Sequence, residues 1–171
     1  MTSPPANPET YISVDVETAG PNPSQYSLLA IGACSVFYPE RNFYIELKPV
    51  NLSFHPEALE SCGLSLEILA QEGVDPGEAI QRFETWLQEA LPTGEQPIFV
   101  GFNAPFDWMF VNDYFHRFLG NNPFGHAAID IKSFYMGLAI IPWAETTMQF
   151  LGRLYLSQPA LIHHALRDAL D

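Results

Sequence analysis

The stretch Ile12-Ser-Val-Asp15-Val-Glu17-Thr-Ala-Gly20 places two carboxylates at the end of an apolar run, directly before a proline turn. In a β-strand, side chains two positions apart point to the same face of the sheet, so Asp15 and Glu17 are expected to project together. Like charges this close repel, and their burial is costly unless a metal ion, a shared proton or water compensates them. A solvated edge strand explains a lone Asp-x-Glu better, so the interpretation depends on the acidic motifs that follow.

The length and composition predict one globular domain, and the order of strands and helices given below predicts the α/β class. The chain has 171 residues, of which 47% are hydrophobic and 13% aromatic. That length supports one core of reasonable size but not two comfortable domains. The longest apolar run, at residues 28–38, is broken by Gly32 and Ser35. It is shorter than the roughly 18 to 20 apolar residues of a membrane span, so no membrane association is expected.

The amino terminus and the cysteines favour a cytoplasmic protein. Residues 1–10 have neither a basic start nor an apolar stretch, so they predict a flexible lead-in rather than a secretory signal. The single domain is expected to occupy residues 11–171. Cys34 and Cys62 lack the spacing of metal ligands and predict free thiols, which suits a reducing compartment.

The net charge of −13 argues against a broad electrostatic grip on nucleic acid. It remains compatible with a phosphate-bearing substrate that is held mainly through metal ions. Two of the seven basic residues precede residue 80 and five follow it. The later ones can form a weakly positive flank, although ordinary surface charge is the simpler explanation for any one of them.

Hydrophobic periodicity and turn residues predict three strands, followed by strands that alternate with helices. Strands are expected at residues 11–16, 28–37, 42–48, 96–101 and 127–131, the last of them buried. Helices are expected at 56–71 in two pieces, at 76–91, at 105–119, after the last strand to 138, and from 145 to the end with a break at Gln158-Pro159. Short gaps favour an antiparallel start, and Gly32 predicts a bulge or a close approach. The pattern indicates a mixed sheet flanked by helices.

The second acidic motif, Val100-Gly-Phe-Asn-Ala-Pro-Phe-Asp107, lies where the fourth strand gives way to a helix. Ligands usually bind at that edge of an open α/β sheet. The proline suits an early helical position, which puts Asp107 in the first turn, near the positive end of the helix dipole. A helix-stabilising role alone also explains Asp107, and Asn103 can be a turn residue. Phe106 and Phe110 are expected in the core.

The third motif, His163-His-Ala-Leu-Arg-Asp168, sets a histidine five residues before an aspartate. Five residues along a continuous helix turn the side chains about 140° apart. His163 and Asp168 therefore converge best if His163 lies at or before the helix start. Adjacent helical residues point apart, so the histidine pair does not suit one metal ion. We interpret His163 as the chemical residue and His164 as its neighbour.

Together the motifs Asp15-Val-Glu17-Thr-x-Gly, Asn103-Ala-x-Phe-Asp107 and His163-x-Ala-x-x-Asp168 resemble the three motifs of the DEDDh family of 3′–5′ exonucleases, in the family's order. The first is especially similar to ribonuclease T, and the proofreading exonuclease of bacterial replicative DNA polymerase is a more distant relative. The resemblance implies a ribonuclease H-like fold, with a five-stranded mixed sheet whose first three strands are antiparallel.

The resemblance also implies roles for individual residues. His163 matches the general base, and the residues that match the four acids of a site for two Mg²⁺ or Mn²⁺ ions are Asp15, Glu17, Asp107 and Asp168. Asp15 is expected to bridge both ions, with Glu17 and Asp168 on one of them and Asp107 nearby. Positions expected to contact the substrate are Thr18, Ala19, Phe102 and Asn103.

Phe102 stands where relatives often carry histidine, so it can fill the core or stack on a base. Trp108 and Phe124 offer the same two alternatives, and at least two of the three are expected in the core. Ribonuclease T-like proteins hold RNA with basic patches of a partner subunit. The sequence shows no comparable basic cluster, and a homodimer stays an open alternative.

The expected function is hydrolysis of phosphodiester bonds from the 3′ end of single-stranded nucleic acid or short oligonucleotides. Two divalent ions roughly 4 Å apart can activate water, offset phosphate charge and stabilise the leaving 3′-oxygen. A histidine suits removal of the proton from the attacking water. The alternatives are an inactive nucleic-acid- or protein-binding module on the same fold, and a metalloprotein that is not a nuclease. Filled catalytic positions disfavour the first, and motif order disfavours the second.

Overall fold

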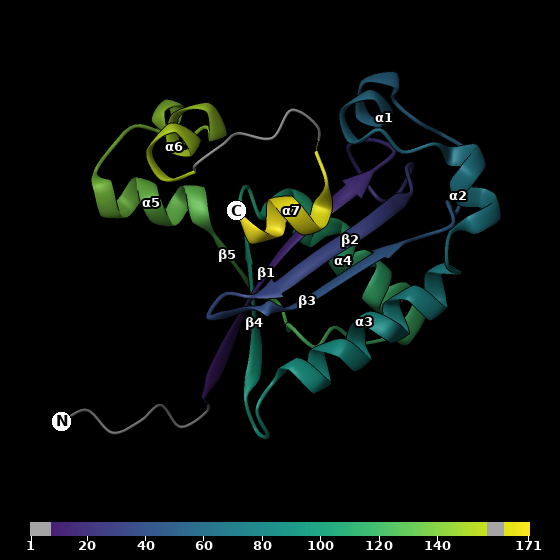
Figure 1. Cartoon of the computed structure of the whole chain (residues 1–171), viewed down its shortest axis with the longest axis horizontal. Helices are drawn as coiled ribbons and strands as arrows, with labels where there is room; N and C mark the ends of the chain where they lie inside the picture. The colour runs from purple at the N-terminus through teal and green to yellow at the C-terminus, as the bar shows by residue number, and fades with distance from the viewer. Residues whose placement is uncertain (1–7, 157–162) are drawn as a thin grey trace.

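The computed structural model describes residues 8–156 and 163–171 and shows a five-stranded mixed sheet with helices on both faces (Figure 1). Across the sheet the strands follow the order β3 (Tyr38–Glu46), β2 (Leu28–Ser35), β1 (Glu9–Thr18), β4 (Gln96–Gly101) and β5 (Ala128–Asp130). The first three pair antiparallel, whereas β4 runs parallel to β1 and β5 parallel to β4. The predicted mixed sheet with an antiparallel start is confirmed.

Seven α-helices and one short 3₁₀ helix occur among the described residues. They are α1 (Pro56–Cys62), α2 (Leu66–Glu72), α3 (Pro76–Ala90), α4 (Pro105–Leu119), α5 (Ile131–Ala139), η1 (Trp143–Glu145), α6 (Met148–Tyr155) and α7 (Ala165–Leu170). None of these helices is both long and apolar enough to cross a membrane. The predicted helix break at Gln158-Pro159 and residues 1–7 of the predicted lead-in lie outside the described part of the chain.

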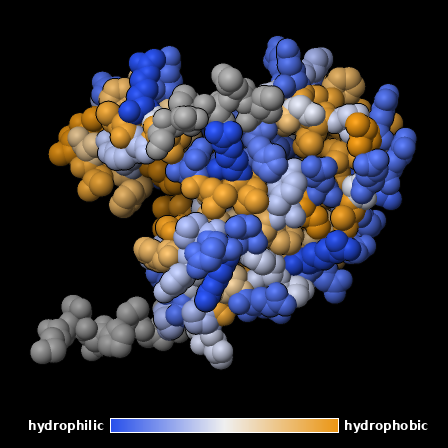
Figure 2. All heavy atoms as spheres, in the orientation of Figure 1, coloured by the Kyte–Doolittle hydropathy of each residue, from blue (hydrophilic) through white to orange (hydrophobic). Residues whose placement is uncertain are grey.

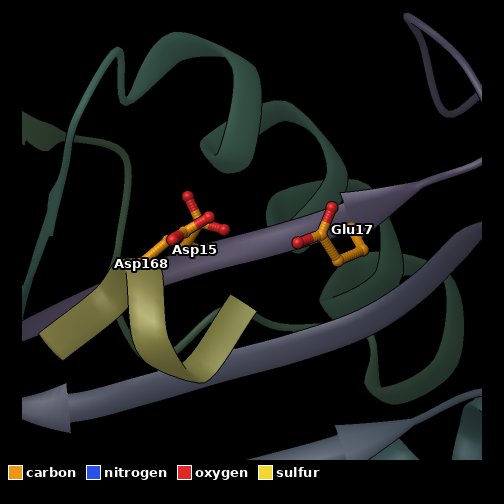
Figure 3. Close-up of side chains that lie close together, drawn as sticks. All are labelled: Asp15, Glu17 and Asp168. Atoms are coloured by element: carbon orange, nitrogen blue, oxygen red, sulfur yellow. The ribbon is translucent and has the colours of Figure 1, made fainter. Parts of the chain in front are cut away.

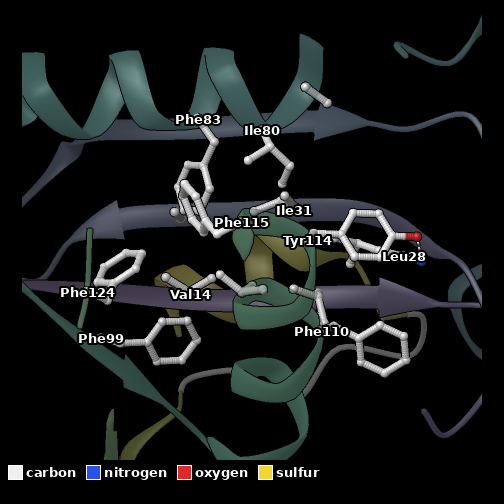
Figure 4. Close-up of a cluster of buried hydrophobic side chains, with 14 of the residues drawn as sticks. Val14, Leu28, Ile31, Ile80, Phe83, Phe99, Phe110, Tyr114, Phe115 and Phe124 are labelled. Atoms are coloured by element: carbon white, nitrogen blue, oxygen red, sulfur yellow. Dashed lines mark hydrogen bonds between the residues drawn. The ribbon is translucent and has the colours of Figure 1, made fainter. Parts of the chain in front are cut away.

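The main core fills the space between the sheet and helices α3 and α4 (Figure 4). Alternate residues of β1, namely Ile12, Val14 and Val16, turn to this side and are buried. Aromatic rings from α3, β4, α4 and the loop before β5 pack against them; they are Phe83, Phe99, Phe110, Phe115 and Phe124. Full burial of each such ring is worth about 1.5–3 kcal/mol. This packing fixes β1, and therefore its acidic face, in place.

Helix α7 covers the opposite face of the sheet, across β1 and β2 (Figure 1). Gly32 on β2 permits this contact, because a Cβ there would lie 2.1 Å from the backbone of Ala165 and Leu166. The Cys34 thiol also reaches α7, with Sγ 3.2 Å from the carbonyl oxygen of Ala169. The close approach predicted at Gly32 is confirmed. Cys34 and Cys62 are both free thiols, as predicted.

Some boundaries differ from the prediction. Strand β1 begins at Glu9, so Glu9 and Thr10, predicted as lead-in, belong to the sheet. Strand β2 ends at Ser35, and Val36 and Phe37 form an exposed two-residue turn despite their apolar side chains. The predicted burial of β5 was wrong. Its residues are only half-buried because β5 is the edge strand of the sheet.

Helices α5, η1 and α6 lie together beyond the β5 edge, and we call residues 131–156 the α5–α6 lobe (Figure 1). Hydrophobic residues gather on its surface in the view of Figure 2. The large hydrophobic side chains that the lobe exposes are Ile131, Phe134, Leu138, Ile140, Trp143, Met148, Phe150, Leu154 and Tyr155. The lobe is therefore less completely packed than the rest of the described chain.

Candidate active site

Three carboxylates from opposite ends of the chain converge on the face of β1 that α7 covers (Figure 3). Asp15 and Glu17 project from β1, and Asp168 reaches them from α7. One oxygen from each of the three lies within 4.8 Å of the others, a spacing at which a single cation can contact all of them. Asp15 pairs directly with Gly32 across the sheet. Because Gly32 lets α7 approach the sheet closely, it also determines how near Asp168 comes to Asp15.

Asp107 enters the site from the other side of β1, at the first turn of α4. Strands β1 and β4 pair only as far as Ser13 and Val100, which leaves the N–H of Val16 without a strand partner. Asp107 accepts a hydrogen bond from this N–H through Oδ1 at 3.1 Å. The structure therefore places Asp107 next to the acid pair of β1 but outside the group of three that share one small space.

Burial and neighbouring charges raise the pKa values of Glu17, Asp107 and Asp15. Burial is the main cause that raises the pKa of Glu17 to about 7, and the Asp168 charge adds to it. Burial likewise raises the pKa of Asp107 to about 7. The pKa of Asp15 also lies well above its usual range, because burial and the charges of Asp107, Glu17 and Asp168 all disfavour ionisation.

The Oε1 oxygen of Glu17 gives independent evidence that the site suits a cation. This oxygen is buried, and no described residue gives it a hydrogen bond. A buried carboxylate oxygen without a partner is unfavourable unless a cation completes its environment. Carboxylates from two elements, a shared small space and this unpaired oxygen fit a hard divalent cation. The residues present therefore suit the metal ions that the motifs imply.

His163 lies just before α7, and its Nδ1 is 3.0 Å from Oδ2 of Asp168. The side chain is 70% exposed, and no described residue forms a hydrogen bond with Nε2. If Nδ1 carries the hydrogen and donates it to Asp168, Nε2 keeps a lone pair directed away from that bond. The neighbouring His164 stacks on Tyr44, with ring centroids 4.5 Å apart, and so plays a packing role.

A cavity of about 430 Å³ opens in front of the acids, and we call it the terminal pocket. The residues that line it are Asp15, Val16, Glu17, Thr18, Gly20, Pro21, His55, Glu57, Ala58, Ser61, Phe102, Asn103, Phe106, Asp107 and His163. Of the residues predicted to contact the substrate, Thr18, Phe102 and Asn103 line this pocket. Ala19 does not, because it is fully buried, its N–H donates to Ser27 and its carbonyl accepts from His55.

Two residues of the terminal pocket were not predicted to contact a substrate. Phe106 was expected in the core, yet it is only half-buried and lines the terminal pocket, whereas Phe110, one turn later, is fully buried. His55 caps no helix with its side chain and packs edge-on against Tyr26, with ring centroids 5.1 Å apart. Periodicity could not separate the two phenylalanines, and an isolated His55 gives no signal of its own.

Comparison with known proteins identifies a close relative by sequence. The chain is 47% identical to the 3′–5′ DNA exonuclease Cap18 of Escherichia coli over 161 residues, which cover 94% of this chain and 86% of that protein. No protein-family model matches the chain.

Solved structures share its fold. The nuclease domain of 3′hExo, a DEDDh family member bound to rAMP, superposes with a TM-score of 0.76 at 14% identity, over 98% of this chain and 88% of the other. The zinc-bound complex of E. coli exonuclease I with single-stranded DNA gives a TM-score of 0.74 at 15% identity and covers 95% of this chain. The chain spans only 38% of the exonuclease I chain.

Proposed function

This chain belongs to the DEDDh family of 3′–5′ exonucleases, and we propose that its substrate is the 3′ end of single-stranded DNA. The observation that carries the proposal is the convergence of Asp15, Glu17 and Asp168, with His163 hydrogen-bonded to the last of them. The 47% identity to a DNA exonuclease supports DNA as the substrate. A catalytically silent binding module is not favoured, because such a module has no need for this costly set of buried acids.

We propose that Asp15, Glu17 and Asp168 hold the divalent metal, two Mg²⁺ or Mn²⁺ ions, with Asp107 contributing from α4. Both metals prefer oxygen ligands of this kind. When bound, they lower the pKa of water and offset the charge of the phosphate and of the leaving oxygen. The unpaired Glu17 Oε1 and the raised pKa values of the acids support this assignment.

His163 acts as the general base in this proposal. Its Nδ1–H donates to Asp168, which orients the ring, and Nε2 accepts a proton from the attacking water. The water oxygen forms a bond to phosphorus while the bond from phosphorus to the 3′-oxygen of the preceding nucleotide breaks, and this 3′-oxygen takes up a proton from solvent. The products are a nucleoside 5′-monophosphate and a strand that is one nucleotide shorter and ends in a 3′-hydroxyl.

The terminal pocket holds the nucleotide that is removed. Thr18 and Asn103 offer polar groups at its rim, and Phe106 offers an aromatic face on which a base can stack. Because bases of every type have such a face, this contact predicts little sequence preference. We also propose a cytoplasmic location, where the free Cys34 and Cys62 thiols are kept reduced.

The test is digestion of 5′-labelled single-stranded DNA and RNA of matched sequence, each with Mg²⁺, Mn²⁺ or EDTA. We expect a ladder that shortens from the 3′ end, requires metal and appears faster on DNA. A second DNA carrying a blocked 3′-hydroxyl should resist digestion. Cleavage inside the strand, or faster digestion of RNA, would contradict the proposal.

A further inference from the structure

A second cavity, of about 250 Å³, lies on the other side of the catalytic acids, between β1 and the α5–α6 lobe. We call it the lobe cleft. Asp15 and Phe102 line both the lobe cleft and the terminal pocket, so the two cavities meet at the acids. Asp168 also faces the lobe cleft. A phosphate held at the acids therefore has one cavity on each side.

The walls of the lobe cleft are mainly aromatic and apolar. Tyr135 of α5 and Tyr155 of α6 line it, with their rings edge to face at 5.8 Å and their hydroxyl oxygens 3.0 Å apart. Met148 and Phe102 add further apolar surface. Apart from Asp15, Asp168 and Asp171, which also line the cleft, these walls offer little to a metal ion, and their aromatic rings suit the flat face of a nucleobase.

A lysine stands beside the cleft. Lys132 Nζ lies 4.2 Å from the centroid of the Trp143 ring and 5.8 Å from that of Phe102. Among the described residues it forms no ion pair with an acid. The whole lobe, residues 131–156, contains two basic residues and one acidic residue, in a chain whose net charge is −13. The lobe is therefore the flank that least repels a phosphate backbone.

We propose that the lobe cleft binds the nucleotide on the 5′ side of the scissile phosphate, with its base against Phe102, Tyr135 and Tyr155. This inference rests on the proposed function. If the terminal nucleotide fills the terminal pocket and its phosphate lies at the acids, the rest of the strand leaves on the opposite side, where the lobe cleft opens. Lys132 then lies within reach of the following phosphate.

The lobe cleft also accounts for a preference for single strands. A base that enters a cavity between β1 and the lobe cannot remain paired, so a duplex end must open before it is digested. Opening costs a few kcal/mol when the base is paired and far less when the strand is already single. A fully paired blunt end should consequently be digested more slowly than the same strand alone.

The experiment compares two substrates that share the catalytic site but differ in the upstream nucleotide. One is a 5′-labelled single-stranded DNA oligonucleotide. The other is the 4-nitrophenyl ester of thymidine 5′-monophosphate, which has a terminal nucleotide and no upstream one. Tyr135→Leu should raise KM for the oligonucleotide by about 10-fold, the worth of one stacked base. Its kcat/KM on the ester should stay within about twofold, since no stacked base is lost there.

Two further variants guard against misfolding and non-specific effects. Tyr155 is 67% exposed, so Tyr155→Leu should fold normally and show the same split between substrates. Phe134→Leu is the matched control, because Phe134 is also on α5 but does not line the lobe cleft. It should leave both substrates unaffected.

Several outcomes would overturn the inference. One is an unchanged KM for the oligonucleotide in both tyrosine variants, and another is an equal loss of kcat/KM on both substrates. A third is a changed oligomeric state with an unaltered KM, which would mean that the lobe cleft binds a second copy of the chain. If the wild-type protein cleaves neither substrate, the proposed function fails instead. Binding of a fluorescent oligonucleotide in Ca²⁺ then tests the lobe cleft separately. The tyrosine variants must weaken this binding, and Phe134→Leu must not.

Discussion

Glu17 combines one buried oxygen without a hydrogen bond and a pKa raised to about 7, at the end of a strand whose next residues turn away. The folded protein thus binds a proton that an unfolded glutamate, with a pKa of 4.5, releases earlier. In the absence of a cation, a buried Glu17 carboxylate therefore destabilises the fold.

The stability of the metal-free protein should fall as pH rises. Between pH 4.5 and about 7, the unfolded chain loses the Glu17 proton while the folded protein keeps it, so deprotonation favours unfolding. Glu17 alone should contribute about 3 kcal/mol to this loss. Asp107 and Asp15, whose pKa values are also raised, should add to it. Denaturant titrations in EDTA at several pH values measure it. Glu17→Gln should make the fall in stability less steep, and exposed Glu67→Gln should not; equal slopes in all three proteins would contradict this cause.

His163→Ala should lower kcat by about 10²–10⁴-fold, the usual contribution of a general base. Because His163 is 70% exposed, the variant should fold and melt like the wild type. His164→Ala is the matched control, since His164 stacks on Tyr44 and does not line the terminal pocket. Single-turnover rates in Mn²⁺ give the comparison. Comparable losses in the two variants would point to the placement of α7 rather than to proton transfer.

Single residues were predicted from the sequence where chemistry limits the choice. Acids two apart on a strand have a simpler explanation when they stand alone, but with a histidine and an aspartate near the other end of the chain they predicted one site, and the structure brings these side chains together. Ala19 was carried over from the family, but its backbone is already occupied by the turn that follows β1. The place of Phe106 in the terminal pocket and that of Lys132 beside the lobe cleft could not be predicted, because their surroundings depend on elements that are distant in sequence.

Among the elements, α7 is only six residues long, yet it determines much of the geometry of the site. It carries Asp168, follows His163 directly and rests on Gly32. Such a short helix has little stability of its own, so its position depends on this packing. The contact with the sheet therefore controls the geometry of the acids.

Gly32→Ala should displace α7 and impair catalysis. The added Cβ would lie 2.1 Å from backbone atoms, which cannot move aside as a flexible side chain can. We expect a loss of about 10²-fold in kcat/KM from misplacement of Asp168 and His163. Destabilisation should be about 1–3 kcal/mol, as for other overpacked sites. Gly137→Ala in α5 is the control, since its Cβ meets open space; wild-type activity in Gly32→Ala would refute the role of α7.

Elements were easier to predict than their ends. Gln96–Gly101 and Pro105–Leu119 match the expected boundaries because proline and glycine mark them. The turn at Val36 and Phe37 was missed, since hydrophobic residues there continue the pattern of the strand. What places them in a turn is the pairing of β2 with β3, which the local sequence does not encode.

For the whole molecule, a net charge of −13 argues against a broad basic surface as the source of affinity for nucleic acid. In the proposed binding mode, metal ions and stacked bases supply this affinity, and Lys132, next to Phe102 and Trp143, is a local exception. The acidic composition then limits the enzyme to short contacts at the strand end rather than a long groove.

The affinity for single-stranded DNA should depend only weakly on salt. At constant Ca²⁺, the slope of log affinity against log KCl should be about −0.7 for each phosphate neutralised, so one or two contacts give a slope near −1. Fluorescence anisotropy across a KCl series measures it. Lys132→Gln should make the slope shallower, whereas Lys48→Gln, at an exposed residue that lines neither cavity, should not. A slope steeper than about −3 would indicate an extended basic surface that contacts several phosphates, and it would contradict the prediction.

The most direct measurement is calorimetric titration of the protein with Mn²⁺ at neutral pH, in two buffers of different ionisation enthalpy. We predict saturable binding that releases protons, because Glu17 and Asp107 have pKa values of about 7 and must ionise to bind metal. Asp15→Asn should abolish this binding, and Glu67→Gln, which removes the same charge from an exposed site on α2, should preserve it. Saturable binding that persists in Asp15→Asn, or its absence from the wild-type protein, would contradict the assignment of the metal site.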